Sequence, residues 1–216
     1  MSLRYRTILF DLDGTLIDHF QAIHRCHAHT LRQLGLPEPT MEQVRRAVGA
    51  GLEVALARLA GPANVAAALP IYTALWDATM LDDVAALPGA AELLTRLRAA
   101  GGTCAVLTNK RGPSARAICD HLGLTALLAG VFGAGDTPWL KPDPRLAAHA
   151  LAALHADARS TCLVGDSPYD LAAANQAALG FVGVATGTHT ASELRAAGAI
   201  VVCADLSAAG DVLLAG

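Results

Sequence analysis

Beyond residue 84, short apolar runs alternate with stretches whose apolar residues recur at helical spacing. The runs that we expect to form strands are Cys104 to Leu107, Gly130 to Phe132, Cys162 to Val164, Phe181 to Val184 and Ile200 to Cys203, together with Arg4 to Phe10 near the start. Strands that alternate with helices are typical of a mostly parallel sheet covered on both faces. The pattern therefore predicts an α/β fold with a doubly wound sheet.

Residues 18 to 82 lack this alternation and predict consecutive helices instead. The expected helices span residues 18–34, 41–49, 51–60 and 64–80, and glycine- or proline-containing breaks separate them. Pro88-Gly89 then returns the chain to the strand-and-helix pattern. We therefore predict an α/β core domain, residues 1–16 and 84–216, and an inserted all-helical cap domain, residues 17–83.

Composition excludes several classes of protein. The net charge is −3 and no basic tract of five residues occurs, so we expect no nucleic-acid partner. No apolar run reaches the roughly 20 residues of a membrane helix, so we expect no membrane partner. The five cysteines are scattered without a CxxC pair, which disfavours a disulfide framework or a structural zinc site. The segment MSLRYRTILF lacks an export signal, and we expect a cytoplasmic protein.

Polar residues follow the predicted strands at the points where the strands end. They are Asp11 and Asp13 after the first strand, Thr108, Asn109 and Lys110 after the second, Lys141 before Pro142, and Asp166 to Asp170 after the fourth. The carboxyl ends of parallel strands meet at one edge of a sheet, and ligands bind there. No GxGxxG or GxxxxGK[ST] motif accompanies them, so we do not expect a nucleotide-cofactor enzyme.

Crowded carboxylates repel one another and require a compensating charge. Mg²⁺ prefers oxygen ligands and often joins one or two carboxylates to a substrate phosphate, so we expect a Mg²⁺ cofactor and a small phosphorylated metabolite as substrate. The only lysines are Lys110 and Lys141, and their ammonium groups suit phosphoryl oxygens. One of the two aspartates in Asp11-Leu12-Asp13 can attack phosphorus, and the other can exchange protons with the leaving group and water.

These four segments, in this order, resemble the motifs of the haloacid dehalogenase superfamily, with a helical insertion after the first motif. The resemblance implies that Asp11 is the nucleophile and a metal ligand, and that Asp13 is the acid/base and offers its backbone carbonyl to the metal. It further implies that Asp166 completes the metal site. Asp170 would either bind the metal through water or orient Lys141.

The resemblance also assigns the phosphate site and favours one subclass. Thr108 and Asn109 would hold the phosphoryl group, and Lys141 would stabilise its charge. Asp13 argues against true dehalogenases, and the absence of lysine from residues 18–82 argues against phosphonate cleavage. The segments most resemble phosphoglycolate phosphatases, so we expect a phosphatase acting through an aspartyl phosphate, with phosphoglycolate as the leading substrate. A phosphosugar mutase and a non-catalytic phosphate-binding protein are the alternatives.

Several residues remain open at this stage. Lys110 points either to solvent or to substrate. Trp139 either lines the site or has a role in the core or at the surface. Residues His19, His24, Cys26, His27 and His29 are dense enough to suggest zinc, but no distant partner completes a ligand set. We favour histidines that lie at the cleft or in solvent, and contact of one of them with substrate is the less favoured alternative. Arg45 and Arg46 suit a substrate carboxylate but are more commonly solvated helix residues.

Overall fold

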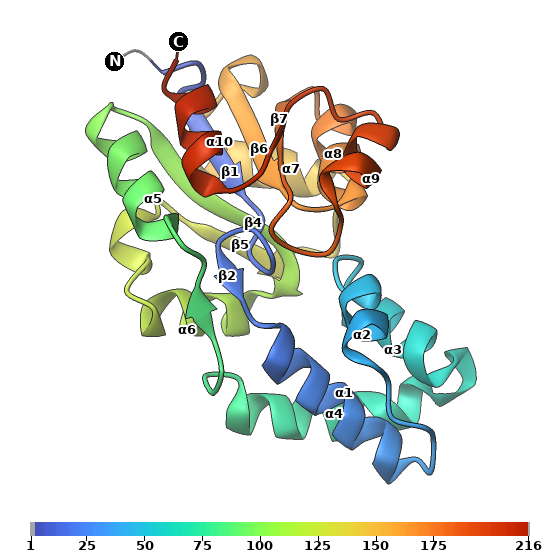
Figure 1. The fold of residues 1–216 in the computed structure, drawn as a ribbon. Helices are drawn as coiled ribbons and strands as arrows, with labels where there is room; N and C mark the ends of the chain where they lie inside the picture. Colours follow the sequence, from blue (N-terminus) through green and yellow to red (C-terminus); the bar gives the residue numbers. More distant parts are fainter. Residues whose placement is uncertain (1–2, 216) are drawn as a thin grey trace.

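The computed structural model describes residues 3–215, which form a six-stranded sheet with helices on both faces and a separate group of helices at one end (Figure 1). The strands of this sheet are β1 (Thr7–Phe10), β4 (Thr103–Arg111), β5 (Val131–Ala134), β6 (Thr161–Gly165), β7 (Gly180–Val184) and β8 (Val202–Cys203). Their order is β5-β4-β1-β6-β7-β8, and every neighbouring pair is parallel. The predicted α/β fold class is confirmed.

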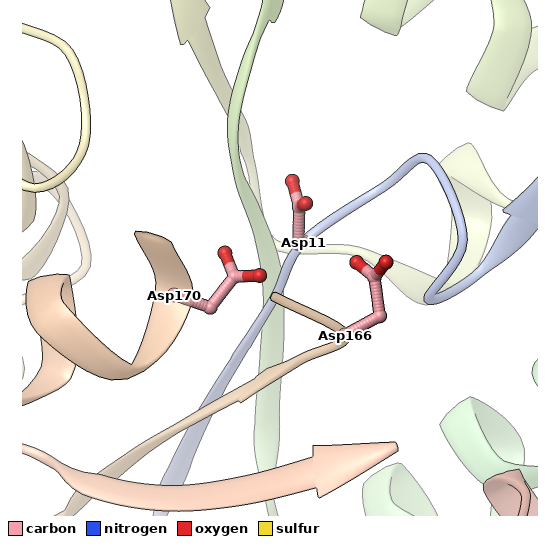
Figure 2. Close-up of side chains that lie close together, drawn as sticks. All are labelled: Asp11, Asp166 and Asp170. Atoms are coloured by element: carbon pink, nitrogen blue, oxygen red, sulfur yellow. The ribbon is translucent and has the colours of Figure 1, made fainter. Parts of the chain in front are cut away.

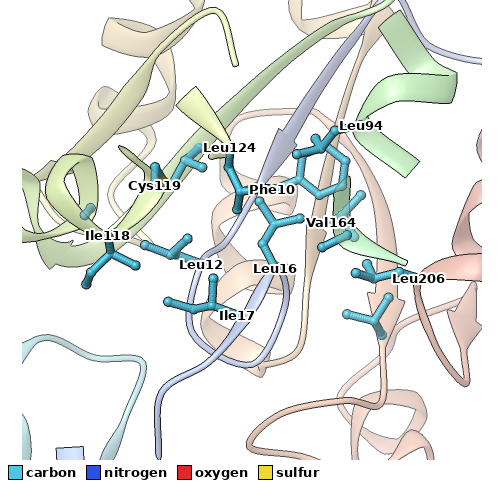
Figure 3. Close-up of a cluster of buried hydrophobic side chains, with 14 of the residues drawn as sticks. Phe10, Leu12, Leu16, Ile17, Leu94, Ile118, Cys119, Leu124, Val164 and Leu206 are labelled. Atoms are coloured by element: carbon cyan, nitrogen blue, oxygen red, sulfur yellow. The ribbon is translucent and has the colours of Figure 1, made fainter. Parts of the chain in front are cut away.

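Helices cover the sheet because its strands are apolar on both faces. The flanking helices are α5 (Ala90–Ala99), α6 (Gly112–His121), α7 (Pro144–Ala153), α8 (Pro168–Gln176), α9 (Ala191–Ala196) and α10 (Leu206–Leu213). Ile8 and Phe10 of β1 pack in the core that α5, α6 and α10 cover. Figure 3 shows Phe10 among the side chains of this core. Leu9 points to the other face, where α7 and α8 cover it. Successive side chains of β1 thus point to opposite faces of the sheet and pack in different cores, as expected for a pleated strand.

Four helices lie beyond the carboxyl end of β1, at the bottom of Figure 1. They are α1 (Phe20–Gln33), α2 (Met41–Ala47), α3 (Leu52–Ala60) and α4 (Val65–Thr79). A two-stranded antiparallel ribbon, β2 (Ile17–Asp18) with β3 (Ala85–Ala86), joins them to the sheet. The sequence analysis did not anticipate this ribbon, because two-residue strands carry no periodic signal. We call α1 to α4 the helical cap, and its status as a separate domain stays a prediction.

Several strands begin or end at other residues than the sequence predicted. The first strand begins at Thr7 rather than Arg4, because Arg4 and Arg6 are exposed and precede the buried run. Ile200 lies outside β8 and is 96% exposed. Strand β4 continues past Leu107 through an irregularity in its pairing with β5. None of the helices within residues 3–215 is long and apolar enough to cross a membrane.

Candidate active site

Three carboxylates meet where β1 and β6 end. Asp11 follows β1 directly, and its backbone N–H donates to Val164 O of β6 at 2.9 Å. Asp166 follows β6, and Asp170 lies in the first turn of α8. Figure 2 shows the three side chains turned toward one another, and each offers an oxygen within 4.8 Å of the others. The structure thus brings together three of the acids at the predicted strand ends, whereas the side chain of Asp13 lies outside this cluster.

Burial and nearby negative charge make the carboxylates of Asp11 and Asp166 hard to ionise. Burial raises the pKa of Asp11 to about 6, with a further increase from Asp170 and a decrease from Lys141. Burial also raises the pKa of Asp166 to about 7, and the charges of Asp170 and Asp11 add to the effect. A site with this electrostatic character favours a cation near its oxygens.

Lys141 supplies part of the compensating charge. Its Nζ lies 2.8 Å from Asp11 Oδ1 and 2.7 Å from Asp170 Oδ1, and its side chain is 1% exposed. Burial alone would lower the pKa of this amine, but Asp11 and Asp170 outweigh burial and raise the pKa above its usual value. Asp170 Oδ2 also accepts hydrogen bonds from the backbone and hydroxyl of Ser167. Both oxygens of Asp170 are therefore engaged by protein groups, which favours the role of orienting Lys141.

Asn109 fixes the backbone at Lys141. Its Oδ1 accepts from Lys141 N at 2.7 Å, and its Nδ2 donates to Lys141 O and to Gly49 O, both at 2.9 Å. The side-chain amide is thus occupied by protein partners, and its predicted contact with a phosphoryl group stays a prediction. Thr108 is 2% exposed, and its Oγ accepts a hydrogen bond from Lys110 N.

Asp13 lies between Lys110 and His19. Lys110 Nζ is 2.9 Å from both carboxylate oxygens, and this ammonium group also lies 4.5 Å from the centre of the Trp76 ring. The side chain of Lys110 therefore points into the site and not to solvent. His19 Nδ1 is 3.7 Å from Asp13 Oδ1, but burial and Lys110 lower the pKa of His19 to about 4, so it is neutral at pH 7.

A group that the sequence analysis missed holds Asp166. Thr188 donates to Asp166 Oδ2 from its backbone N–H at 2.6 Å and from its hydroxyl at 2.8 Å, while the Thr15 hydroxyl donates to Oδ1 at 3.3 Å. A Cβ on Gly187 would lie 2.1 Å from Asp166 Oδ2, so only glycine fits there. Thr188 lies just beyond the carboxyl end of β7, so the strand-end argument, extended to that strand, would have found it.

A cavity between the helical cap and the sheet adjoins this site. Asp11, Asp13, Thr108 and Lys110 line its floor, and residues of α1, α3 and α4 line the opposite wall. Trp139 is not part of its lining. That partly buried ring packs against the core residues of α7, with the Arg145 guanidinium 5.1 Å from its centre.

The structure also places the cap histidines and arginines whose roles the sequence left undecided. His27 lines the cavity, whereas His24 Nε2 lies 2.9 Å from the carbonyl oxygen of Pro39. The Arg45 guanidinium lies 4.2 Å from the centre of the Phe20 ring, and Arg46 Nη1 pairs with Glu193 of α9 at 2.8 Å.

The acid cluster fits Mg²⁺ by its own geometry. Asp11 Oδ1 is buried and accepts no aligned hydrogen bond within residues 3–215, although it is near Lys141. The donor set consists of carboxylate oxygens, which Mg²⁺ prefers over nitrogen or sulfur. Asp11 and Asp166 would hold the ion, with Asp170 behind them.

Comparisons with known proteins agree with this geometry. A family model described as haloacid dehalogenase-like hydrolase matches residues 8–184. The chain is 37% identical over 196 residues to "Probable phosphatase IndB" of Dickeya dadantii, which covers 88% of this chain and 85% of that protein. It is 34% identical to the phosphoglycolate phosphatase of Caulobacter vibrioides, with 91% and 85% covered. A solved structure titled as a predicted phosphatase from Clostridium acetobutylicum shares the fold, with a TM-score of 0.91, 22% identity, and 98% and 99% covered.

Proposed function

We propose a function from one premise: the chain belongs to the haloacid dehalogenase-like hydrolase family, whose model spans most of its length. Its relatives include named phosphatases, and it is a hydrolase of the phosphatase class. The proposed reaction is Mg²⁺-dependent hydrolysis of a small phosphomonoester through an aspartyl phosphate. The observation that carries the proposal is the buried cluster of Asp11, Asp166 and Asp170 beside Lys141.

Asp11 is the nucleophile of the proposed reaction. One of its carboxylate oxygens attacks phosphorus, and the bond between phosphorus and the ester oxygen breaks, so that the phosphoryl group passes to Asp11. Lys141, 2.8 Å from Asp11, neutralises charge on the transferring phosphoryl oxygens. A Mg²⁺ ion, when bound, supplies further positive charge to the phosphoryl oxygens and to the acids.

Asp13 moves the protons. It gives a proton to the departing alkoxide, which leaves as the alcohol. A water molecule then attacks phosphorus while Asp13 takes its proton, and the bond between phosphorus and Asp11 breaks to release inorganic phosphate. Lys110, 2.9 Å from both oxygens of Asp13, fixes the direction of this carboxylate.

The test compares Asp11→Asn with the wild type in an assay of phosphate release. Phosphoglycolate, which the name of a relative suggests, belongs in the panel beside sugar phosphates and nucleotides. We expect Asp11→Asn to lose at least about 10³-fold in kcat, because no oxygen nucleophile of the same charge replaces it. Chelator should abolish wild-type activity, and added Mg²⁺ should restore it.

The control is Asp120→Asn, an exposed aspartate on α6 far from the acid cluster in sequence and structure. It should keep wild-type activity. Activity of Asp11→Asn within tenfold of the wild type, with the same dependence on Mg²⁺, would contradict the proposed mechanism.

A further inference from the structure

The wall of the cavity opposite the acid cluster belongs to the helical cap and is apolar. Its side chains include Ile23, Val48, Leu52, Ala55, Tyr72 and Trp76. Within residues 3–215, the cap residues that line this cavity include no lysine, arginine, aspartate or glutamate. This wall faces the half of the substrate that leaves as the alcohol, because the opposite side holds the phosphoryl group.

The cations on the sheet side of the cavity are already paired. Lys110 Nζ lies 2.9 Å from both oxygens of Asp13, and Arg111 Nη1 lies 3.1 Å from Asp77 Oδ1. A negative charge on the alcohol half of a substrate would therefore face apolar side chains without a free cation. Burial of an unpaired carboxylate is strongly unfavourable.

Three aromatic rings follow one another along the cap wall. The ring centres of His27 and Tyr72 are 4.7 Å apart, and those of Tyr72 and Trp76 are 5.9 Å apart with nearly parallel planes. Such rings favour a flat ring in the ligand through stacking and edge contacts. Tyr72 and Trp76 are 5% and 4% exposed, so a ligand ring would contact the small part of these rings that borders the cavity.

His27 is a polar residue of α1 that lines this wall. The residue is 1% exposed, and its Nδ1 has no hydrogen-bond partner within the described residues. Burial lowers the pKa of His27 to about 4, so the imidazole is neutral at pH 7 and can offer a ring nitrogen as donor or acceptor. A buried polar atom without a partner is rare, and a ligand group can satisfy it.

We infer that the cavity takes phosphomonoesters whose alcohol half is uncharged and carries a flat ring that hydrogen-bonds to His27. This inference rests on the proposed phosphatase function and names the substrate class of the same site. It makes phosphoglycolate a poor substrate, because its carboxylate would face the uncharged cap wall.

The test measures kcat/KM of the wild type for two matched pairs of esters. In the first pair, 2-hydroxyethyl phosphate replaces the carboxylate of phosphoglycolate with a neutral CH₂OH group. In the second pair, thymidine 5′-monophosphate adds a flat ring to 2-deoxyribose 5-phosphate. We expect the neutral ester and the ring-bearing ester each to exceed its partner by at least about tenfold.

A charge added to the cap wall provides a gain-of-function test. Val48 lines the cavity, and Val48→Lys places a flexible ammonium group in the wall. We expect kcat/KM for phosphoglycolate to rise at least fivefold relative to that for 2-hydroxyethyl phosphate. The matched control is Val54→Lys, since Val54 is 40% exposed and does not line the cavity. This control should leave the ratio unchanged.

His27→Phe tests the polar atom, because phenylalanine keeps an aromatic ring and removes both nitrogens. It should lower kcat/KM for thymidine 5′-monophosphate about three- to tenfold more than that for 2-hydroxyethyl phosphate, as expected for one lost hydrogen bond. An equal loss for both esters would indicate a purely structural role and would overturn the assignment of His27.

The outcomes separate this inference from the proposed function. Mg²⁺-dependent hydrolysis with phosphoglycolate as the best of the four esters would overturn the inference and leave the proposed function intact. Failure to hydrolyse any of the four esters would contradict the proposed function and, with it, the inference.

Discussion

The carboxylate of Asp166 is held by residues from two distant parts of the chain. Thr15 binds one oxygen, and Thr188 binds the other through both its hydroxyl and its backbone N–H. Groups that hydrogen-bond a metal-binding carboxylate fix its direction and tune its affinity for the metal. Thr188 should therefore act on catalysis through Asp166 rather than by contact with substrate.

Thr188→Val should weaken the apparent affinity for Mg²⁺ about tenfold and change kcat little at saturating Mg²⁺. The valine keeps the shape and the backbone N–H but removes the hydroxyl that donates at 2.8 Å. A titration of activity against Mg²⁺ measures the effect. Thr95→Val, on the exposed face of α5, is the control and should match the wild type. Unchanged Mg²⁺ dependence in Thr188→Val would contradict the positioning role.

Protonation of His27 should make the free energy of unfolding depend on pH. Burial, with a smaller contribution from His24, lowers the pKa of His27 to about 4, and His27 packs against the Tyr72 ring. Between pH 4 and pH 6.5 the unfolded chain binds a proton at this position and the folded chain does not, so stability falls as pH falls. From this residue, the free energy of unfolding should be roughly 2 kcal/mol lower at pH 5 than at pH 8.

The measurement compares melting temperatures at pH 8 and pH 5. The difference should be smaller in His27→Gln than in the wild type, by roughly 4 to 8 °C. His121→Gln is the control because His121 is exposed on α6, and it should keep the wild-type difference. An identical pH dependence in His27→Gln and the wild type would contradict the prediction.

The helices α2 and α8 begin with the same reciprocal capping arrangement, but the arrangement has a different role in each. In α2, Thr40 accepts from Gln43 N, and the Gln43 side chain accepts from Thr40 N. In α8, Ser167 and Asp170 form the reciprocal pair, and Asp170 also binds Lys141. The start of α8 therefore positions a site residue while it stabilises the helix, whereas the start of α2 only stabilises the helix.

Ser167→Ala and Thr40→Ala should each cost about 1 kcal/mol, which corresponds to a decrease in melting temperature of roughly 2 to 4 °C. Only Ser167→Ala should also lower kcat, by about tenfold, because Asp170 loses the hydroxyl that fixes its carboxylate. Thermal melts and phosphate-release assays on both variants give the comparison. Equal kcat in the two variants would contradict a link between this cap and the site.

At the scale of the whole molecule, contacts across the cavity hold the helical cap against the sheet. Arg46 of α2 pairs with Glu193 of α9 at 2.8 Å, and Arg58 of α3 donates to the Tyr169 hydroxyl of α8. Asn109 of β4 donates to the carbonyl of Gly49, which precedes α3. The Arg46–Glu193 pair is exposed, whereas the hydrogen bond from Trp76 Nε1 of α4 to Ser114 Oγ of α6 is buried. The exposed contacts can separate at little cost when the cap opens for substrate entry and product release.

Arg46→Ala should make the closed arrangement less favourable by less than about 1 kcal/mol, because an exposed ion pair contributes little. We expect KM to rise two- to fivefold with kcat within twofold, and the difference from the wild type to shrink at high salt. Arg32→Ala is the control, since the Arg32 and Glu38 pair lies entirely within the cap. A rise in KM of the same size in Arg32→Ala would contradict a role for the cross-cavity pair.

The sequence by itself determined the fold class and most of the acid cluster. Short apolar runs and helical patterns reflect burial, which is local to each strand and helix, and Asp11 and Asp166 follow recognisable strand ends. The tertiary structure decided which groups meet across distance. It joined Thr188 to Asp166 and turned Lys110 toward Asp13. It also placed an uncharged aromatic wall over the site, because contacts between distant segments depend on packing that no local pattern encodes.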